Sequence, residues 1–175
     1  MKKCLLFIVM VLMVYPFSSY SEANAATTDQ LNINDQNVQA YKEGTVSIEG
    51  IKIGDKMSKI KSKYPDLMFS YSDDSNDREN YYEFDTKNGH MIVTAKVHNN
   101  KETVKRITMI YNEMTDVHLD QLVSMLGKHT TKRVQNNKYT GGYAYVNNQQ
   151  AHFQLSKATP SSKQFKVYRV DVGKY

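Results

Sequence analysis

Two similar segments lie about 62 positions apart, and this repeat constrains the fold more than any other feature of the sequence. The first spans residues 51–66 and the second residues 113–128. In each, apolar residues recur three or four positions apart, the spacing of one face of a short helix. A helix-breaking residue, Pro65 or Gly127, lies near the end of each segment, where such a helix should stop. The apolar positions that coincide are Met57 with Leu119, Ile60 with Leu122, and Tyr64 with Leu126. The pattern predicts two equivalent short helices.

The residues that follow each helix also correspond, and their apolar and polar residues alternate as in antiparallel strands with one buried face. Residues 81–84 align with 143–146, and His90 aligns with His152. We expect strands over 81–85, 90–98 and 102–111, then over 139–146, 150–158 and 164–172. The Asn88–Gly89 pair predicts a tight hairpin turn with positive φ angles. We expect inward positions at Met91, Val93, Ala95, Val97, Phe153 and Leu155, and outward positions at His90, Ile92, Thr94, Lys96, His152, Gln154 and Ser156.

These elements predict an α+β protein with one curved antiparallel sheet packed on two short helices. Neither unit, 51–112 or 113–175, is large enough to bury a core of its own, so both belong to a single domain over 46–175. Residues 45–53 alternate weakly and predict a short strand, and Asp55 is a candidate cap for the first helix. The acidic segment 70–80 has no pattern and predicts a loop. Residues 26–45 are polar and predict a disordered arm.

The N-terminus has the three parts of a secretory signal peptide. A basic start precedes an apolar run over 4–15, and Ala23-Asn24-Ala25 is a small-residue cleavage site. We therefore expect residues 1–25 to be removed and the protein to be secreted, either extracellular or loosely attached to the cell surface. Cleavage removes Cys4, the only cysteine, so the mature chain has no disulfide and no thiol chemistry. No second apolar run is long enough to span a bilayer.

The positive charge is concentrated in residues 113–175, which contain nine Lys and Arg against four Asp and Glu. Such a balance favours an anionic partner, although it also simply keeps an exported protein soluble. Cations beside tyrosines suit nucleic acid or another polyanion, because cations neutralise phosphates and tyrosine rings stack on bases. The same tyrosines could instead be cross-strand packing partners and the lysines edge protection. The candidate binding residues are Lys132, Arg133, Lys138, Tyr139, Tyr143, Tyr145, Lys166 and Arg169.

No catalytic motif is present, so we expect a non-enzymatic protein without a cofactor. His90 and His152 occupy matching positions on the predicted outer face. Two facing histidines could bind a metal, but they are also explained as surface polarity because no third ligand is evident. The alternative, from a different class of function, is a module that binds a host protein or inhibits an enzyme through the open sheet face.

The overall plan resembles the immunodominant staphylococcal antigen B family of exported proteins. The resemblance is carried by the signal peptide, the polar arm, the segment VSIEGIKIGDKMSKIKSKYPD, the segment DVHLDQLVSMLGK and the Tyr-rich hairpins that end near Tyr175. It covers most of the mature chain in outline. The resemblance implies a secreted or cell-surface, non-enzymatic protein that binds extracellular nucleic acid without sequence preference.

Overall fold

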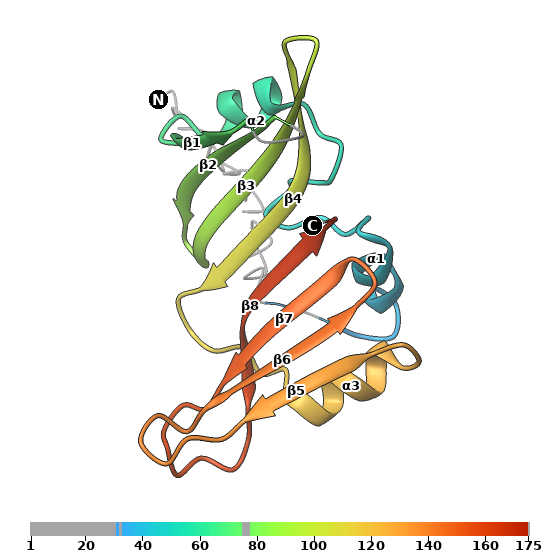
Figure 1. The fold of residues 1–175 in the computed structure, drawn as a ribbon, viewed down its shortest axis with the longest axis vertical. Helices are drawn as coiled ribbons and strands as arrows, with labels where there is room; N and C mark the ends of the chain where they lie inside the picture. Colours follow the sequence, from blue (N-terminus) through green and yellow to red (C-terminus); the bar gives the residue numbers. More distant parts are fainter. Residues whose placement is uncertain (1–30, 32, 75–77, 175) are drawn as a thin grey trace, which may run out of the picture.

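A single eight-stranded sheet forms the body of the protein, and every neighbouring pair of its strands is antiparallel (Figure 1). The computed structural model describes residues 31, 33–74 and 78–174. The predicted signal peptide 1–25 and the start of the polar arm lie outside these residues. The strands are β1 (Met68–Asp73), β2 (Glu79–Thr86), β3 (Gly89–His98), β4 (Lys101–Tyr111), β5 (Thr131–Gln135), β6 (Tyr143–Asn148), β7 (Ala151–Ser156) and β8 (Lys166–Gly173). The helices are α1 (Val38–Glu43), α2 (Met57–Lys63) and α3 (Leu119–Leu126).

The strand order is β1-β2-β3-β4-β8-β7-β6-β5, so each half of the sheet is a four-stranded meander that follows one helix. In Figure 1 the first half is green to yellow and the second half orange to red. The halves join where β4 pairs with β8, and Met109 lies opposite Val170 in that pair. The predicted α+β class and antiparallel sheet are therefore confirmed, with β1 and β5 as the two open edges.

The central hairpins of the two halves share one register. In the β2–β3 hairpin, Phe84 lies opposite Met91 and Asp85 opposite His90. In the β6–β7 hairpin the partners are Val146 with Phe153 and Asn147 with His152, the positions 62 residues later. The correspondence expected between these strands therefore extends to the pairing of individual residues.

The predicted inward positions form the core except for Val97, which is only partly buried near the end of β3. Met91, Val93 and Ala95 of β3 are fully buried, as are Phe153 and Leu155 of β7. Met57 and Ile60 of α2 and Leu122 and Leu126 of α3 belong to the same buried cluster, so the helices cover the inner face of the sheet. Among the predicted outward residues Thr94 is an exception, because it is buried under a hydrogen bond from Arg106 on the outer face.

Both predicted helices are present, but Asp55 does not cap the first one. The N-cap position of α2 is Lys56, without a side-chain hydrogen bond to the helix. The Asp55 carboxylate instead accepts a hydrogen bond from the backbone N–H of Lys52 at 2.9 Å, within the preceding turn. Residues 45–53 are not a strand either, since an isolated bridge between Ile48 and Ile51 is their only ladder contact.

Part of the polar arm is folded. Residues 38–43 form α1, and Tyr41 on this helix is 5 % exposed with its ring centroid 6.1 Å from that of Phe153. Leu31 and Ile33 are buried as well. A few apolar residues in an otherwise polar segment are enough to dock it on the core, so the described part of the arm packs against the body.

The edge strands β1 and β5 were not predicted, and the loop expected over 70–80 is partly strand, because β1 extends to Asp73 and β2 begins at Glu79. Every residue of β5 is exposed, as are the first five of β1. A strand with two solvated sides has no alternation of apolar and polar residues, so the usual period-2 signal is absent.

The β2–β3 turn lies where Asn88–Gly89 predicts it, but neither residue has a positive φ. A glycine is needed at position 89 because there is no room for a side chain: a Cβ there would lie 2.0 Å from the carbonyl oxygen of Ile110 on β4. The positive φ angles occur at the next turn, where Asn99 and Asn100 have φ of 48° and 59°.

Candidate nucleic-acid interface

The outer face of β5–β8, on the side of the sheet away from the helices, displays two of the predicted tyrosines. Along β6, Tyr143 and Tyr145 alternate with the fully buried Ala144 and Val146. The two rings are 43 % and 40 % exposed. They are therefore not enclosed by cross-strand packing and remain available for stacking with a partner.

Arg133 joins these tyrosines, but Lys132 does not. In the β5–β6 register Arg133 lies opposite Tyr145, whereas Lys132 lies opposite the buried Val146. Residues that are directly opposite in an antiparallel pair share a face. Arg133 therefore belongs to the outer face, and Lys132 projects at the edge on the helix side. The structure separates two residues that the sequence grouped together.

Lys138 and Tyr139 lie in the turn between β5 and β6, at one end of the outer face. Tyr139 is 75 % exposed, and the Lys138 ammonium lies 4.7 Å from its ring centroid. The side-chain oxygen of Asn137 accepts hydrogen bonds from the backbone N–H groups of Tyr139 and Thr140, which orders the turn. The turn thus presents a cation and an aromatic ring together.

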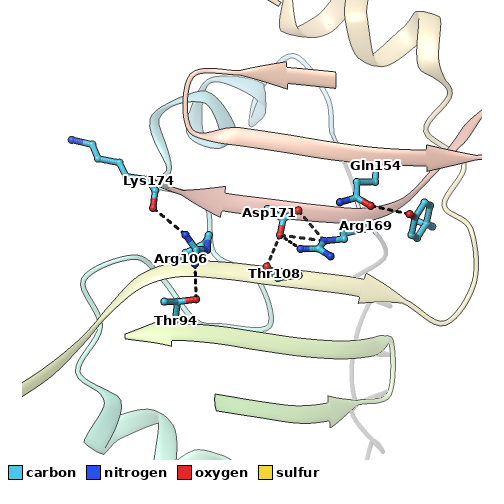
Figure 2. A network of polar contacts seen from close by, with 8 residues as sticks. Thr94, Arg106, Thr108, Gln154, Arg169, Asp171 and Lys174 are labelled. Carbon is cyan, nitrogen blue, oxygen red and sulfur yellow. Dashed lines mark hydrogen bonds and ion pairs between the residues drawn. The ribbon is translucent and has the colours of Figure 1, made fainter. Parts of the chain in front are cut away.

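The two predicted cations of β8, Lys166 and Arg169, differ in how strongly a carboxylate neutralises their charge. Lys166 is bonded to Asp116 at 3.1 Å, but that carboxylate is 93 % exposed, and exposed pairs contribute little. Arg169 instead donates from Nε and Nη2 to the buried carboxylate of Asp171, with the Nη2 contact at 2.7 Å (Figure 2). Arg169 therefore neutralises an internal charge, and Lys166 is the more available cation.

Tyr168 is a third tyrosine of this face that the sequence did not identify. Its hydroxyl donates to the side-chain oxygen of Gln154 at 2.9 Å. Burial raises the pKa of Tyr168, and the nearby Tyr145 raises it further. With one residue deleted from the second copy, the repeat aligns Tyr168 with the inward Ile107. A register shift at Gln154/Leu155 instead makes Tyr168 an extra residue of β8 and turns it outward.

Acidic residues are distributed unevenly between the two halves of the sheet. The strands β5–β8 contain one, Asp171, which is 2 % exposed and held by Arg169. The strands β1–β4 contain five: Asp73, Glu79, Glu83, Asp85 and Glu102. Glu102 is paired with Lys61 on the helix side, but Glu83 and Asp85 lie beside His90 on the outer face. A polyanion approaching the outer face therefore meets carboxylates over the first half that the second half lacks.

His90 and His152 both lie on the outer face as predicted, but in different halves. His90 Nδ1 lies 2.8 Å from the Asp85 carboxylate, and its Nε2 lies 3.5 Å from Glu83. His152 lies opposite Asp171 in the β7–β8 register, and burial lowers its pKa. Within the described part of the chain, no three His, Cys, Asp or Glu side chains are grouped to hold a metal ion.

The comparisons with known proteins assign a family to the chain. None of the described helices is long and apolar enough to cross a membrane. A search of the curated proteins gave no match, and neither did a search of the solved structures. A family model described as SA0570-like matches residues 1–173, and this match does not connect the chain to the antigen B family. The chain belongs to the SA0570-like family.

Proposed function

We propose that this protein binds single-stranded nucleic acid, or a polyanion of similar chemistry, without sequence preference through the outer face of β5–β8. The observation that carries the proposal is the exposure of Tyr143 and Tyr145 on one face beside Arg133, on strands whose only carboxylate is buried and neutralised. Tyrosine rings stack on any base, and cations along the path neutralise phosphates.

The proposed site differs from the set of residues predicted from the sequence. Its centre consists of Arg133, Tyr143, Tyr145 and Tyr168, with Lys166 at one side and the turn residues Lys138 and Tyr139 at the end. Arg169 lies on the same face but is not counted among the binding cations, because its guanidinium is bound to the Asp171 carboxylate. Lys132 is outside the site, because it lies on the helix side of the edge strand.

The test is a comparison of Arg133→Gln with Lys132→Gln. Both changes remove one positive charge from neighbouring exposed positions of β5, so any effect of net charge alone is matched. Fluorescence anisotropy with a labelled 15-nucleotide oligothymidine should show weaker binding for Arg133→Gln, with little change for Lys132→Gln. Equal losses in the two variants would show that binding depends on overall charge and not on this face.

Salt dependence separates this proposal from the alternative of a protein-binding or enzyme-inhibitor module on the same face. Binding of a polyanion weakens steeply as salt rises, with a slope set by the number of phosphates contacted. A contact with a packed apolar centre depends much less on salt. The oligothymidine affinity should therefore fall by at least about tenfold between 50 mM and 200 mM salt.

We further propose that the protein acts outside the cell and is not an enzyme. The N-terminal sequence supports export. The three tyrosines and the arginine of the proposed site can stack on bases and neutralise phosphates. Among these four residues there is no nucleophile paired with a general base, as a catalytic site would need. Mass spectrometry of the protein recovered from culture medium, with a mature N-terminus after Ala25, would test the export.

We also propose that the two halves arose by duplication of a unit with one helix and four strands. The shared register of the β2–β3 and β6–β7 hairpins supports this, as does the strand order, which reads alike from both edges. The duplicated halves would then have diverged on the outer face, where Glu83 corresponds to Tyr145 and Asp85 to Asn147.

A further inference from the structure

Two hollows lie on the helix side of the first half, and they share one wall at Lys61. The first, of about 360 Å³, lies between α2 and the β3–β4 turn. The second, of about 470 Å³, lies between α2 and the edge strand β1. Both have the volume of a small-molecule site. They use none of the residues of the proposed nucleic-acid face.

The first hollow is cationic. Lys56, Lys61 and Lys101 are among the residues that line it, with Glu102 as the single acidic residue. Ser58, Asn100 and Thr103 complete the lining. The backbone fixes these residues, because Lys56 forms a bridge with Thr103, and Val104 exchanges backbone hydrogen bonds with Gly54 and Asp55.

Glu102 does not cancel the charge of the hollow, because its carboxylate is already satisfied. It accepts hydrogen bonds from Asn80 and from the Tyr82 hydroxyl, and one from Lys61 at 2.7 Å. Burial raises the pKa of Glu102, but these three hydrogen bonds outweigh it and lower the pKa below its usual value. Glu102 and Lys61 therefore form an internal pair. Within the described residues, Lys56 and Lys101 have no carboxylate partner, so two positive charges remain uncompensated.

The second hollow is aromatic. Its walls are Tyr64, Phe69 and Tyr82, together with Pro65 and Leu67. Phe69 is 56 % exposed, and its ring lies edge-on to Tyr82 with the centroids 5.6 Å apart. Lys61 lies over the Tyr82 ring at 4.5 Å from its centroid, between this hollow and the cationic one. A flat ring placed here would cover an apolar side chain that is otherwise left in water.

We propose that the two hollows form one binding site for a small aryl phosphate. Lys56 and Lys101 would hold the phosphate, with Ser58, Thr103 and Asn100 as further donors, and the ring of the ligand would lie against Phe69. A phosphate monoester suits this arrangement because it carries close to two negative charges and three acceptor oxygens. A simple carboxylate would leave one of the two free lysines uncompensated.

The site is tested with phenyl phosphate as the probe, inorganic phosphate as the probe without a ring, and titration calorimetry. The parent protein should bind phenyl phosphate more tightly than inorganic phosphate. The double variant Lys56→Gln/Lys101→Gln should bind phenyl phosphate at least tenfold more weakly. The matched control is Lys52→Gln/Lys59→Gln, which removes the same charge from exposed residues outside the hollow and should bind as the parent does.

Phe69→Ser separates the two halves of the site. It should weaken phenyl phosphate binding and leave inorganic phosphate binding unchanged, because Phe69 lines only the aromatic hollow. The proposal is overturned if neither probe binds saturably, if the parent binds both equally, or if the control double variant loses as much affinity as the test variant. Arg133→Gln should leave phenyl phosphate binding intact, so failure of this site and failure of the nucleic-acid face are distinguishable.

Discussion

The hydroxyl of Thr108 on β4 donates a hydrogen bond to the Asp171 carboxylate on β8, and this contact crosses the line where the two halves of the sheet meet (Figure 2). Thr108 is 4 % exposed and Asp171 is 2 % exposed. Arg169 binds the same carboxylate from its own strand. A charge that is buried on a sheet face is thus satisfied by donors from both halves, as buried charges must be.

Removing the Thr108 hydroxyl tests how much this contact stabilises the junction. Thr108→Val keeps the shape of the side chain and leaves the carboxylate with one donor fewer, so it should lower the free energy of unfolding by about 1–3 kcal/mol. Thr131→Val, on the exposed edge strand β5, is the control and should change it by less than about 0.5 kcal/mol. Urea denaturation followed by circular dichroism measures both. Equal effects in the two variants would mean that the hydrogen bond is not a stabilising contact.

Tyr41 tests whether α1 is part of the folded body. Tyr41→Ala removes a buried ring that packs near Phe153, so it should cost about 3 kcal/mol in the free energy of unfolding. Gln39→Ala, on the exposed side of the same helix, should be close to neutral. If Tyr41→Ala has no effect on the urea midpoint, then the helix does not pack on the core in solution.

Gly89 and Gly54 require glycine for two different reasons, close backbone packing at Gly89 and a positive φ at Gly54. At Gly89 a Cβ would collide with backbone at 2.0 Å, whereas at Gly54, with φ of 87°, nothing lies within 4 Å. Gly89→Ala should therefore cost about 3 kcal/mol through the clash. Gly54→Ala should cost about 1–2 kcal/mol, through the positive φ alone. The reverse order in thermal or urea unfolding would contradict the close approach of β3 and β4 at the turn.

His152 predicts a dependence of stability on pH. Burial lowers the pKa of His152 in the folded protein below its ordinary value of 6.5, so the unfolded chain binds the proton more readily. The resulting stability is fully present above pH 6.5 and is lost as pH falls through the lower, folded pKa. The free energy of unfolding should thus fall between pH 7.5 and pH 5.5, and His152→Gln should reduce that fall. His98→Gln, at an exposed position, should leave the slope of the parent unchanged.

The sequence was most informative where one side of an element is buried. Leu122 and Leu126 recur at the spacing of a helix and are fully buried, and Phe153 and Leu155 alternate with outward residues as expected. In both cases the periodicity of apolar residues records which side faces the core. The helices α2 and α3 and the inner strands could therefore be predicted, together with the correspondence between the central hairpins.

The proposed binding face was harder to predict, because its assignment depends on a strand and a bulge that leave no apolar pattern. Lys132 and Arg133 are adjacent, and only the recognition of β5 as a strand shows that they lie on opposite sides. Tyr168 faces outward because of the register shift at Gln154/Leu155, which no spacing rule reveals. The pairing of Arg169 with Asp171 is a contact at i and i+2 that the alternation allows but does not require.

The central claim is that the tyrosines of the second half bind nucleic acid, and a matched pair of double variants tests it most directly. Tyr143→Ser/Tyr145→Ser removes the exposed rings of β6, and Tyr71→Ser/Tyr81→Ser removes the stacked pair of the first half, whose centroids are 4.1 Å apart. Affinity for oligothymidine should fall at least about tenfold in the first variant, because each stacked base contributes about 1–3 kcal/mol. It should be nearly unchanged in the second variant. An equal loss in both, or a loss only in the second, would contradict the assignment of binding to the outer face of β5–β8.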